Sequence, residues 1–267
     1  MHWKENLKTK IKMITDKGDV SQMEDIKKNL ETVRGKIREA AEVCGRNEEE
    51  VLLVAVSKTR DPEEINTAIN AGVTDIGENK VQEIMDKYDA IKPVKWHMIG
   101  HLQTNKVKYI IDKVDMIHSV DSMKLAKEID KRAKAHDKVM DVLVQINPAD
   151  EESKFGVSID EAGDLVREIL DSCENISIKG LMSVAPIVED PRDVKPYFDG
   201  VKAKYDELSK ISHPRLDFRY LSMGMSHDFP VAIEAGSNLV RVGSAIFGER
   251  DYAKYRREQE AKKNGNA

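Results

Sequence analysis

The chain has 267 residues, 40% of them hydrophobic, and can bury a substantial core as one large domain or two small ones. Its formal net charge of −5 argues against binding to nucleic acid or to an anionic membrane surface. Its two cysteines, Cys44 and Cys173, have no paired spacing, so we expect neither a disulfide framework nor a zinc site and interpret both as thiols in a reducing compartment.

The amino-terminal fifty residues are predicted to be helical. Between Met23 and Ala41, apolar residues recur at spacings of three and four, which marks one buried face of a helix. The preceding lysine-rich stretch is predicted as a short extra helix or a frayed extension, so we divide the chain into an extension (1–22) and a domain (23–267). The start of the chain is polar, and no apolar run approaches the roughly 20 residues that span a bilayer. We therefore expect a soluble, cytoplasmic protein that does not bind membranes.

After residue 50 the chain alternates between short apolar runs and helix-like stretches. The apolar runs predict strands at 51–56, 75–76, 96–99, 116–117, 142–146, 176–184, 219–221 and 239–242. The helix-like stretches are 62–70, 80–88, 105–112, 123–135, 159–170, 194–209, 229–235 and 244–260. Eight strand–helix units in about 200 residues favour a closed (β/α)8 barrel, a fold of about 250 residues. A doubly wound open sheet is the alternative, but it would more often have a glycine-rich turn after the first strand, which this chain lacks.

Lys58 is the first candidate functional residue. It lies at the carboxyl end of the apolar run 51–56, where α/β folds place their ligands. Burial at such a position disfavours the ammonium form, so the amine becomes a better nucleophile toward carbonyl compounds. The alternative is a lysine that closes the strand and points into solvent.

Polar residues and glycines follow every predicted strand, and in a barrel these segments meet at one face. The segments 222–226 and 243–244 combine glycine with serine and follow the seventh and eighth strands, the usual phosphate position in barrels. Alternatively, the glycines serve turns and the serines cap helices. The presence of both segments in these two loops favours a phosphate site.

Four further polar residues near strand ends need partners. Arg241 on the last strand must find an acceptor, either a ligand heteroatom or a carboxylate such as Glu234. His97, His101 and His118 lack the spacing of a metal site, and we predict hydrogen-bonding or structural roles for them.

A lysine after the first strand and a phosphate cradle after the last two describe a site for pyridoxal phosphate (PLP) on a barrel. The segments that carry the pattern are 55–59, 76–83, 96–106, 118–122, 152–156, 180–182, 221–226 and 240–248. With these segments the chain resembles the pyridoxal phosphate homeostasis protein family, a relative of the barrel domain of alanine racemase. The resemblance covers nearly the whole chain and implies a single (β/α)8 TIM barrel of the alanine racemase type with an extra amino-terminal helix.

The resemblance also implies a set of site residues: Lys58, Asn79, Met223, Ser226, Arg241, Gly243 and Ser244. In this set Lys58 binds PLP as an internal aldimine, and Ser226, Gly243 and Ser244 hold the phosphate, while Arg241 lies beside the pyridine nitrogen. Asn79 and Met223 line the site. A permanently charged arginine keeps that nitrogen unprotonated and weakens the ring as an electron sink. Ser244 replaces a threonine that is common in the family and preserves its hydroxyl.

The resemblance implies a PLP carrier that takes part in PLP (vitamin B6) and amino-acid homeostasis. Its expected partners are PLP and PLP-requiring apo-enzymes, and we expect a monomer without a metal. The alternative is a PLP-dependent amino-acid racemase, which needs a second acid/base from a carboxyl-terminal domain; the short segment after Gly248 cannot build one. A third hypothesis is an aldolase without PLP, in which Lys58 forms a Schiff base with the substrate.

Overall fold

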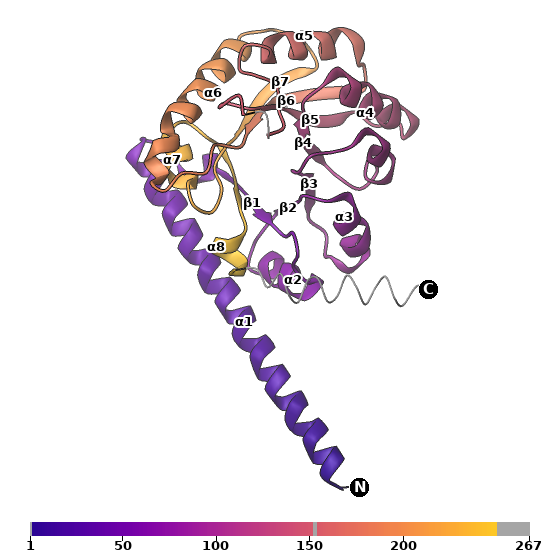
Figure 1. The fold of residues 1–267 in the computed structure, drawn as a ribbon, viewed down its shortest axis with the longest axis vertical. Helices are drawn as coiled ribbons and strands as arrows, with labels where there is room; N and C mark the ends of the chain where they lie inside the picture. Colours follow the sequence, from indigo (N-terminus) through magenta and orange to yellow (C-terminus); the bar gives the residue numbers. More distant parts are fainter. Residues whose placement is uncertain (1, 152–153, 250–267) are drawn as a thin grey trace.

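The structure is a computed structural model that describes residues 2–151 and 154–249. Within this part of the chain, eight parallel strands close into one barrel, in which each strand pairs with its sequence neighbours and β1 pairs with β8 (Figure 1). The strands are β1 Leu52–Val56, β2 Asp75–Glu78, β3 Lys95–Met98, β4 Met116–Val120, β5 Met140–Ile146, β6 Ile176–Ser183, β7 Leu216–Ser222 and β8 Leu239–Val242. The predicted barrel is confirmed, and the open-sheet alternative is wrong because the first and last strands pair.

Helices cover the outside of the barrel (Figure 1). They are α1 His2–Val43, α2 Pro62–Asn70, α3 Val81–Lys87, α4 Met123–Ala135, α5 Ala162–Ser172, α6 Lys195–Leu208, α7 Phe229–Glu234 and α8 Ser244–Phe247, with short 3-10 helices η1 Glu48–Glu50, η2 Tyr88–Ala90, η3 Thr104–Tyr109 and η4 Pro191–Val194. Across the described residues, none of these helices is both long and apolar enough to cross a membrane.

Two predicted helices differ from the structure. The stretch 105–112 was expected to be an α-helix, but η3 is a 3-10 helix followed by turns. Residues three apart eclipse each other in a 3-10 helix, which lets Val107 and Ile110 bury their side chains on one side. The helix expected over 244–260 begins as predicted, but α8 ends at Phe247, and the part beyond 249 lies outside the described residues.

The first helix is longer than the predicted one. α1 runs without interruption from His2 to Val43, so the extension and the predicted helix are one element, and no proline in this stretch would break it. Its amino-terminal part projects away from the barrel (Figure 1). On its later part Ile26, Leu30, Val33 and Ile37 are buried, which confirms the predicted face. The boundary between extension and domain at residues 22 and 23 remains a prediction.

The two faces of each strand have different environments. Outward-facing residues such as Ala55 and Ile76 join the main core between the sheet and the helices. Met116, Leu143 and Met182 form a second, smaller apolar cluster. Because side chains alternate between the two faces, every second residue of a strand points inward, and this inward series continues past the strand end into the barrel mouth.

Candidate functional site

A cavity of about 420 Å³ lies at the carboxyl ends of the strands. Lys58 lies in it, two residues after the end of β1. The lining residues come from the ends of β1, β2, β3, β6, β7 and β8 and are Val56, Lys58, Asn79, Ile99, Val184, Met225, Ser226, His227, Arg241, Gly243 and Ser244. Six of the seven residues predicted for the site therefore lie around one cavity, which we call the mouth cavity.

Met223 is the seventh predicted residue, and it is not among the lining residues. Its side chain is fully buried in the main core, whereas Met225, two residues later, lines the mouth cavity. Between them Gly224 has a φ of 90°, and a Cβ there would lie 2.6 Å from the Cβ of Ala232. Only glycine fits this turn, which redirects the chain after β7.

Five lining residues were not predicted: Val56, Ile99, Val184, Met225 and His227. Val56 could have been inferred from the sequence, because it precedes Lys58 by two residues and so shares its face of β1. The other four depend on how the loops fold over the barrel mouth.

The backbone on both sides of Lys58 is held by buried polar side chains. Thr59 has a φ of 64°, a left-handed conformation that a β-branched residue rarely adopts, and its N–H donates to Glu83 Oε2 at 2.6 Å. Ser57 Oγ donates to Glu78 Oε1 at 2.8 Å, and the Ser57 carbonyl accepts from Lys87 Nζ at 3.0 Å. The backbone around Lys58 is thus anchored to β2 and α3.

Glu78, Glu83 and Lys87 form the ionic part of this anchor. Lys87 Nζ lies 2.8 Å from Glu78 Oε1 and 2.9 Å from Glu83 Oε2, and all three residues are buried. Burial raises the pKa of Glu78 to about 7. For Glu83 burial acts in the same direction, but the Lys87 ammonium outweighs it and lowers the pKa. Burial acts to lower the pKa of Lys87, and the two carboxylates reverse this and raise it. We call this cluster the lysine anchor.

The opposite side of the mouth cavity combines a serine hydroxyl with a glycine–serine turn. Ser226 Oγ accepts the N–H of Gly243 at 3.1 Å and that of Ala245 at 3.4 Å, so the loops after β7 and β8 are fastened together. A Cβ on Gly243 would lie 3.3 Å from both Cβ and the carbonyl oxygen of Val56, which leaves little room for a side chain. Ser226 thus joins the two loops in which the sequence predicts a phosphate cradle.

Arg241 is buried and donates to neutral acceptors. Its NH1 group donates to the carbonyl and the hydroxyl of Ser222, at 2.8 and 2.5 Å, and NH2 donates to the carbonyl of Ser183 at 2.8 Å. Burial lowers the pKa of Arg241 to about 10, opposed by the charge of Asp228. The alternative of an ion pair with Glu234 is wrong, because Arg241 donates to Ser222 and Ser183, while the Glu234 carboxylate lies 3.6 Å from Arg192.

Two of the three histidines lie inside the barrel. His97 contacts His118 at 2.9 Å and Asp75 at 2.8 Å, and His118 contacts Ser222 at 3.3 Å. These contacts confirm the predicted hydrogen-bonding roles of His97 and His118. His101 is exposed and stacks on Phe155 with ring centroids 3.7 Å apart. In the ranges 2–151 and 154–249, no group of three or more His, Cys, Asp or Glu side chains is arranged to hold a metal.

The buried state of His118 predicts a pH dependence of stability. Burial, with His97 and Arg241, holds its pKa well below 6.5, so only the unfolded chain protonates it in mild acid. The unfolded state then binds more protons, and this contribution to stability is present above pH 6.5 and lost as the pH falls. Between about pH 7.5 and 5.5 it should decrease by about 1.4 kcal/mol.

Glu78 has the opposite effect, because its raised pKa makes the folded state bind the extra proton in this pH range. We therefore expect the stability difference between the wild type and His118→Asn to shrink on acidification, as measured by urea unfolding at several pH values. A difference that is constant with pH would contradict the assignment of a neutral His118.

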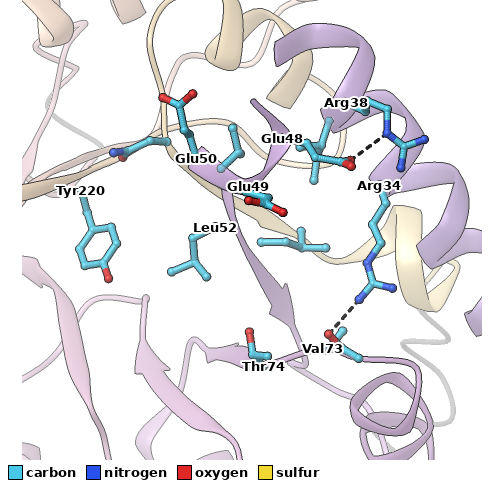
Figure 2. A pocket seen from close by; sticks show the side chains of 14 residues that line it. Arg34, Arg38, Glu48, Glu49, Glu50, Leu52, Val73, Thr74 and Tyr220 are labelled. Atoms are coloured by element: carbon cyan, nitrogen blue, oxygen red, sulfur yellow. Dashed lines mark hydrogen bonds and ion pairs between the residues drawn. The ribbon is translucent and has the colours of Figure 1, made fainter. Parts of the chain in front are cut away.

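A second cavity, of about 570 Å³, lies at the amino ends of the strands (Figure 2). It is larger than the mouth cavity, but its charged groups bond within the protein. Arg38 pairs with Glu48 at 3.0 Å, and Arg34 donates to the carbonyl of Gly72 at 2.8 Å. Barrel enzymes place their chemistry at the carboxyl ends of the strands, and the lysine and the glycine–serine turns lie there. We therefore take the mouth cavity as the functional site.

The chain is similar to known proteins over most of its length. A model of the alanine racemase N-terminal domain matches residues 24–251. A pyridoxal phosphate homeostasis protein of Aquifex aeolicus is 45% identical over 225 residues, which cover 84% of this chain and 97% of that protein. A protein of the same description from Escherichia coli K12 is 39% identical over 244 residues, covering 87% of this chain and 100% of the relative.

Solved structures show the same architecture. A protein of unknown function from Bifidobacterium adolescentis has a TM-score of 0.78 and 34% identity, covering 85% of this chain and 96% of its own. PipY of Synechococcus elongatus PCC7942, solved with PLP bound, has a TM-score of 0.71 and 29% identity, covering 84% of this chain and all of PipY. An alanine racemase of Clostridium difficile 630 has a TM-score of 0.65 at 15% identity over 85% of this chain and 57% of the racemase, a likeness of fold.

Proposed function

This chain belongs to the family of pyridoxal phosphate homeostasis proteins, and we propose that it holds PLP covalently through Lys58 and takes part in PLP and amino-acid homeostasis. The observation that carries the proposal is the mouth cavity, where Lys58 shares one space with Arg241 and with the fastened loops of Ser226 and Gly243. The PLP-bound structure of the relative PipY supports the choice of ligand.

The residues of the mouth cavity fit a PLP molecule. The mouth cavity has a volume of about 420 Å³, which is in the range of pockets for small ligands and cofactors. Asn79 lines it, and the side-chain oxygen of Asn79 is buried without a hydrogen-bond partner, a cost that a ligand donor would remove. Gly243 packs against Val56, which brings its loop close to the end of β1, and its N–H donates to Ser226 Oγ.

PLP carries an aldehyde that condenses with a lysine amine, with loss of water and formation of a C=N bond. In this chain Lys58 supplies the amine, and the lysine anchor keeps the backbone on both sides of it in place. Ser226, Gly243 and Ser244 bind the phosphate group. Arg241 faces the pyridine nitrogen and, with a pKa of about 10, keeps its charge at neutral pH and opposes protonation of that nitrogen.

A carrier role fits this arrangement better than racemisation. Racemisation needs an electron-withdrawing ring and acid/base groups on both faces of the cofactor. A cationic Arg241 beside the nitrogen weakens the electron-withdrawing character of the ring. The ionisable side chains that line the mouth cavity in the described structure are Lys58, Arg241 and His227, and His227 is exposed. We therefore propose that the protein binds PLP and passes it to PLP-requiring enzymes, with little turnover of amino acids.

The direct experiment is to trap PLP on the purified protein. After incubation with equimolar PLP and reduction with borohydride, which converts the C=N bond into a stable amine, we expect peptide mass spectrometry to find one adduct per chain on Lys58. Label spread over exposed lysines such as Lys131 would overturn the proposal.

Two functional assays distinguish a PLP carrier from an amino-acid racemase. PLP-loaded protein should reactivate a PLP-requiring apo-enzyme while a scavenger removes free PLP from solution. Alanine incubated with the same protein should keep its configuration. Fast racemisation of alanine would contradict the carrier role and favour the racemase alternative.

A further inference from the structure

A hydrogen-bonded chain of five buried polar side chains crosses the interior of the barrel, a region that in this fold is dominated by branched apolar residues. Its members, in order, are Asp75 on β2, His97 on β3, His118 on β4, Ser222 on β7 and Arg241 on β8, and none is more than 4% exposed. Successive members lie 2.8, 2.9, 3.3 and 2.5 Å apart. Because β4 and β7 are not neighbours in the sheet, the contact between His118 and Ser222 spans the barrel. We call this set the interior file.

The two ends of the interior file fix its terminal hydrogen bonds. Arg241 can only donate, and Asp75 accepts as a carboxylate, because hydrogen bonds from His97 and Thr74 outweigh burial and lower its pKa. Ser222 therefore accepts from Arg241, and His97 Nε2 donates to Asp75. The directions of the bonds between Ser222, His118 and His97 follow the tautomers of the two imidazoles.

The interior file connects the linings of the two cavities, although Asp75 and Arg241 both pair in register with Val54 of β1. Arg241 lines the mouth cavity at the carboxyl ends of the strands. At the other end, Asp75 Oδ2 accepts from the hydroxyl of Thr74 at 2.6 Å, and Thr74 lines the cavity at the amino ends (Figure 2). Asp75 is linked to the guanidinium through the two imidazoles and the hydroxyl of Ser222, and linked hydrogen bonds polarise one another in a low-dielectric interior.

We propose that Asp75, His97 and His118 are positioning residues for Arg241, and that the interior file sets the orientation and electrostatic field of the guanidinium at the pyridine nitrogen of bound PLP. This inference rests on the proposed function. The acceptors that Arg241 contacts directly are neutral, so its plane is fixed by Ser222 and Ser183. Ser222 in turn is fixed by His118, so a change at the far end of the interior file is felt at the cofactor.

The interior file can be observed in the unaltered protein by NMR of the imidazole nitrogens. Before PLP is added, the ring nitrogens of His97 and His118 should each show a single hydrogen-bonded state. When PLP binds, their resonances should shift, because the field at Arg241 changes. The exposed His136, at the end of α4, should keep its resonance. Unchanged resonances of His97 and His118 in protein that has bound PLP would overturn the proposal.

A matched pair of variants tests the far end of the interior file. Asp75→Asn keeps the shape of the side chain and removes its charge, and we expect PLP to bind at least about fivefold more weakly, with a shifted visible absorbance maximum. The control is Asp141→Asn, which changes a half-buried carboxylate paired with Lys179 on the neighbouring strand and should leave affinity and spectrum unchanged. Wild-type affinity and spectrum in Asp75→Asn would overturn the proposal.

The failure of this inference differs from the failure of the proposed function. A wild-type protein that binds PLP on Lys58, with no response from the interior file, overturns the inference alone. A wild-type protein that does not bind PLP overturns both. If Asp75→Asn does not fold, the imidazole shifts in the unaltered protein still decide the question.

Discussion

Lys58→Ala is expected to abolish covalent retention of PLP while the barrel stays folded. The half-buried Lys58 side chain supplies the amine, but the bonds of the lysine anchor are made by its neighbours Ser57 and Thr59. PLP should still bind through the phosphate loops, about 100-fold more weakly, which corresponds to about 3 kcal/mol. The measurements are the visible absorbance of the bound cofactor, borohydride trapping, and equilibrium dialysis with PLP.

The matched control is Lys131→Ala, which removes an exposed lysine on α4 and should bind PLP as the wild type does. Circular dichroism and urea unfolding should be the same for both variants and the wild type. Stoichiometric trapping of PLP in Lys58→Ala would show that another lysine holds the cofactor, and would contradict the assignment.

Lys87→Met is expected to destabilise the protein by about 3–5 kcal/mol, because it leaves Glu78 and Glu83 buried without their cation. Methionine has nearly the length of lysine, so the loss reflects charge more than packing. The loss should be larger at pH 8 than at pH 6. Without Lys87 the pKa values of both carboxyl groups rise, so the folded state gains protons and stability on acidification. Urea unfolding, followed by tryptophan fluorescence, measures both effects.

Lys195→Met is the control for this prediction. Lys195 pairs with Asp199 one helical turn away, but both side chains are about half exposed, and such pairs contribute at most about 1 kcal/mol. Adding Glu78→Gln to Lys87→Met should recover part of the loss, since it removes one uncompensated charge. Equal costs for Lys87→Met and Lys195→Met would show that the lysine anchor is not a buried ionic unit.

The lysine anchor and Arg241 together suggest why this barrel suits a carrier. The anchor holds the backbone at Thr59 in an uncommon conformation, so Lys58 enters the mouth cavity from a fixed position. Such strain is found where the surrounding structure determines the backbone fully, often at functional sites. Arg241 contributes a fixed positive charge that disfavours carbanion chemistry on the cofactor. Both features support the proposed carrier role.

Much of the fold could be predicted from local pattern. All eight predicted strands are present, because strands buried on both faces appear as short apolar runs between polar loops. The errors lie where the pattern is ambiguous. Val107 and Ile110 are spaced as in a helix, yet the short segment forms a 3-10 turn that buries them. Before residue 23, Leu7, Ile11 and Ile14 stand at helical spacing, but Gly18 and Asp19 interrupt this pattern before it reaches Met23.

The site could be predicted only in part. Lys58, Arg241 and Gly243 were identified because they lie at strand ends, which a parallel barrel brings to one face. The lysine anchor could not be recognised, since Glu83 and Lys87, four residues apart on α3, look like an ordinary surface pair. Their burial depends on the contact of α3 with the end of β1.

The sequence by itself determined that this protein is a barrel with a lysine after its first strand and glycine–serine turns after its last two, because strand and turn preferences are local. Only the tertiary structure decided which side chains meet across the interior. His118 and Ser222 are 104 residues apart, and they touch only because the barrel closes with a particular register. Contacts of that kind anchor Lys58 and connect Arg241 to Asp75, and they depend on the packing of the whole domain.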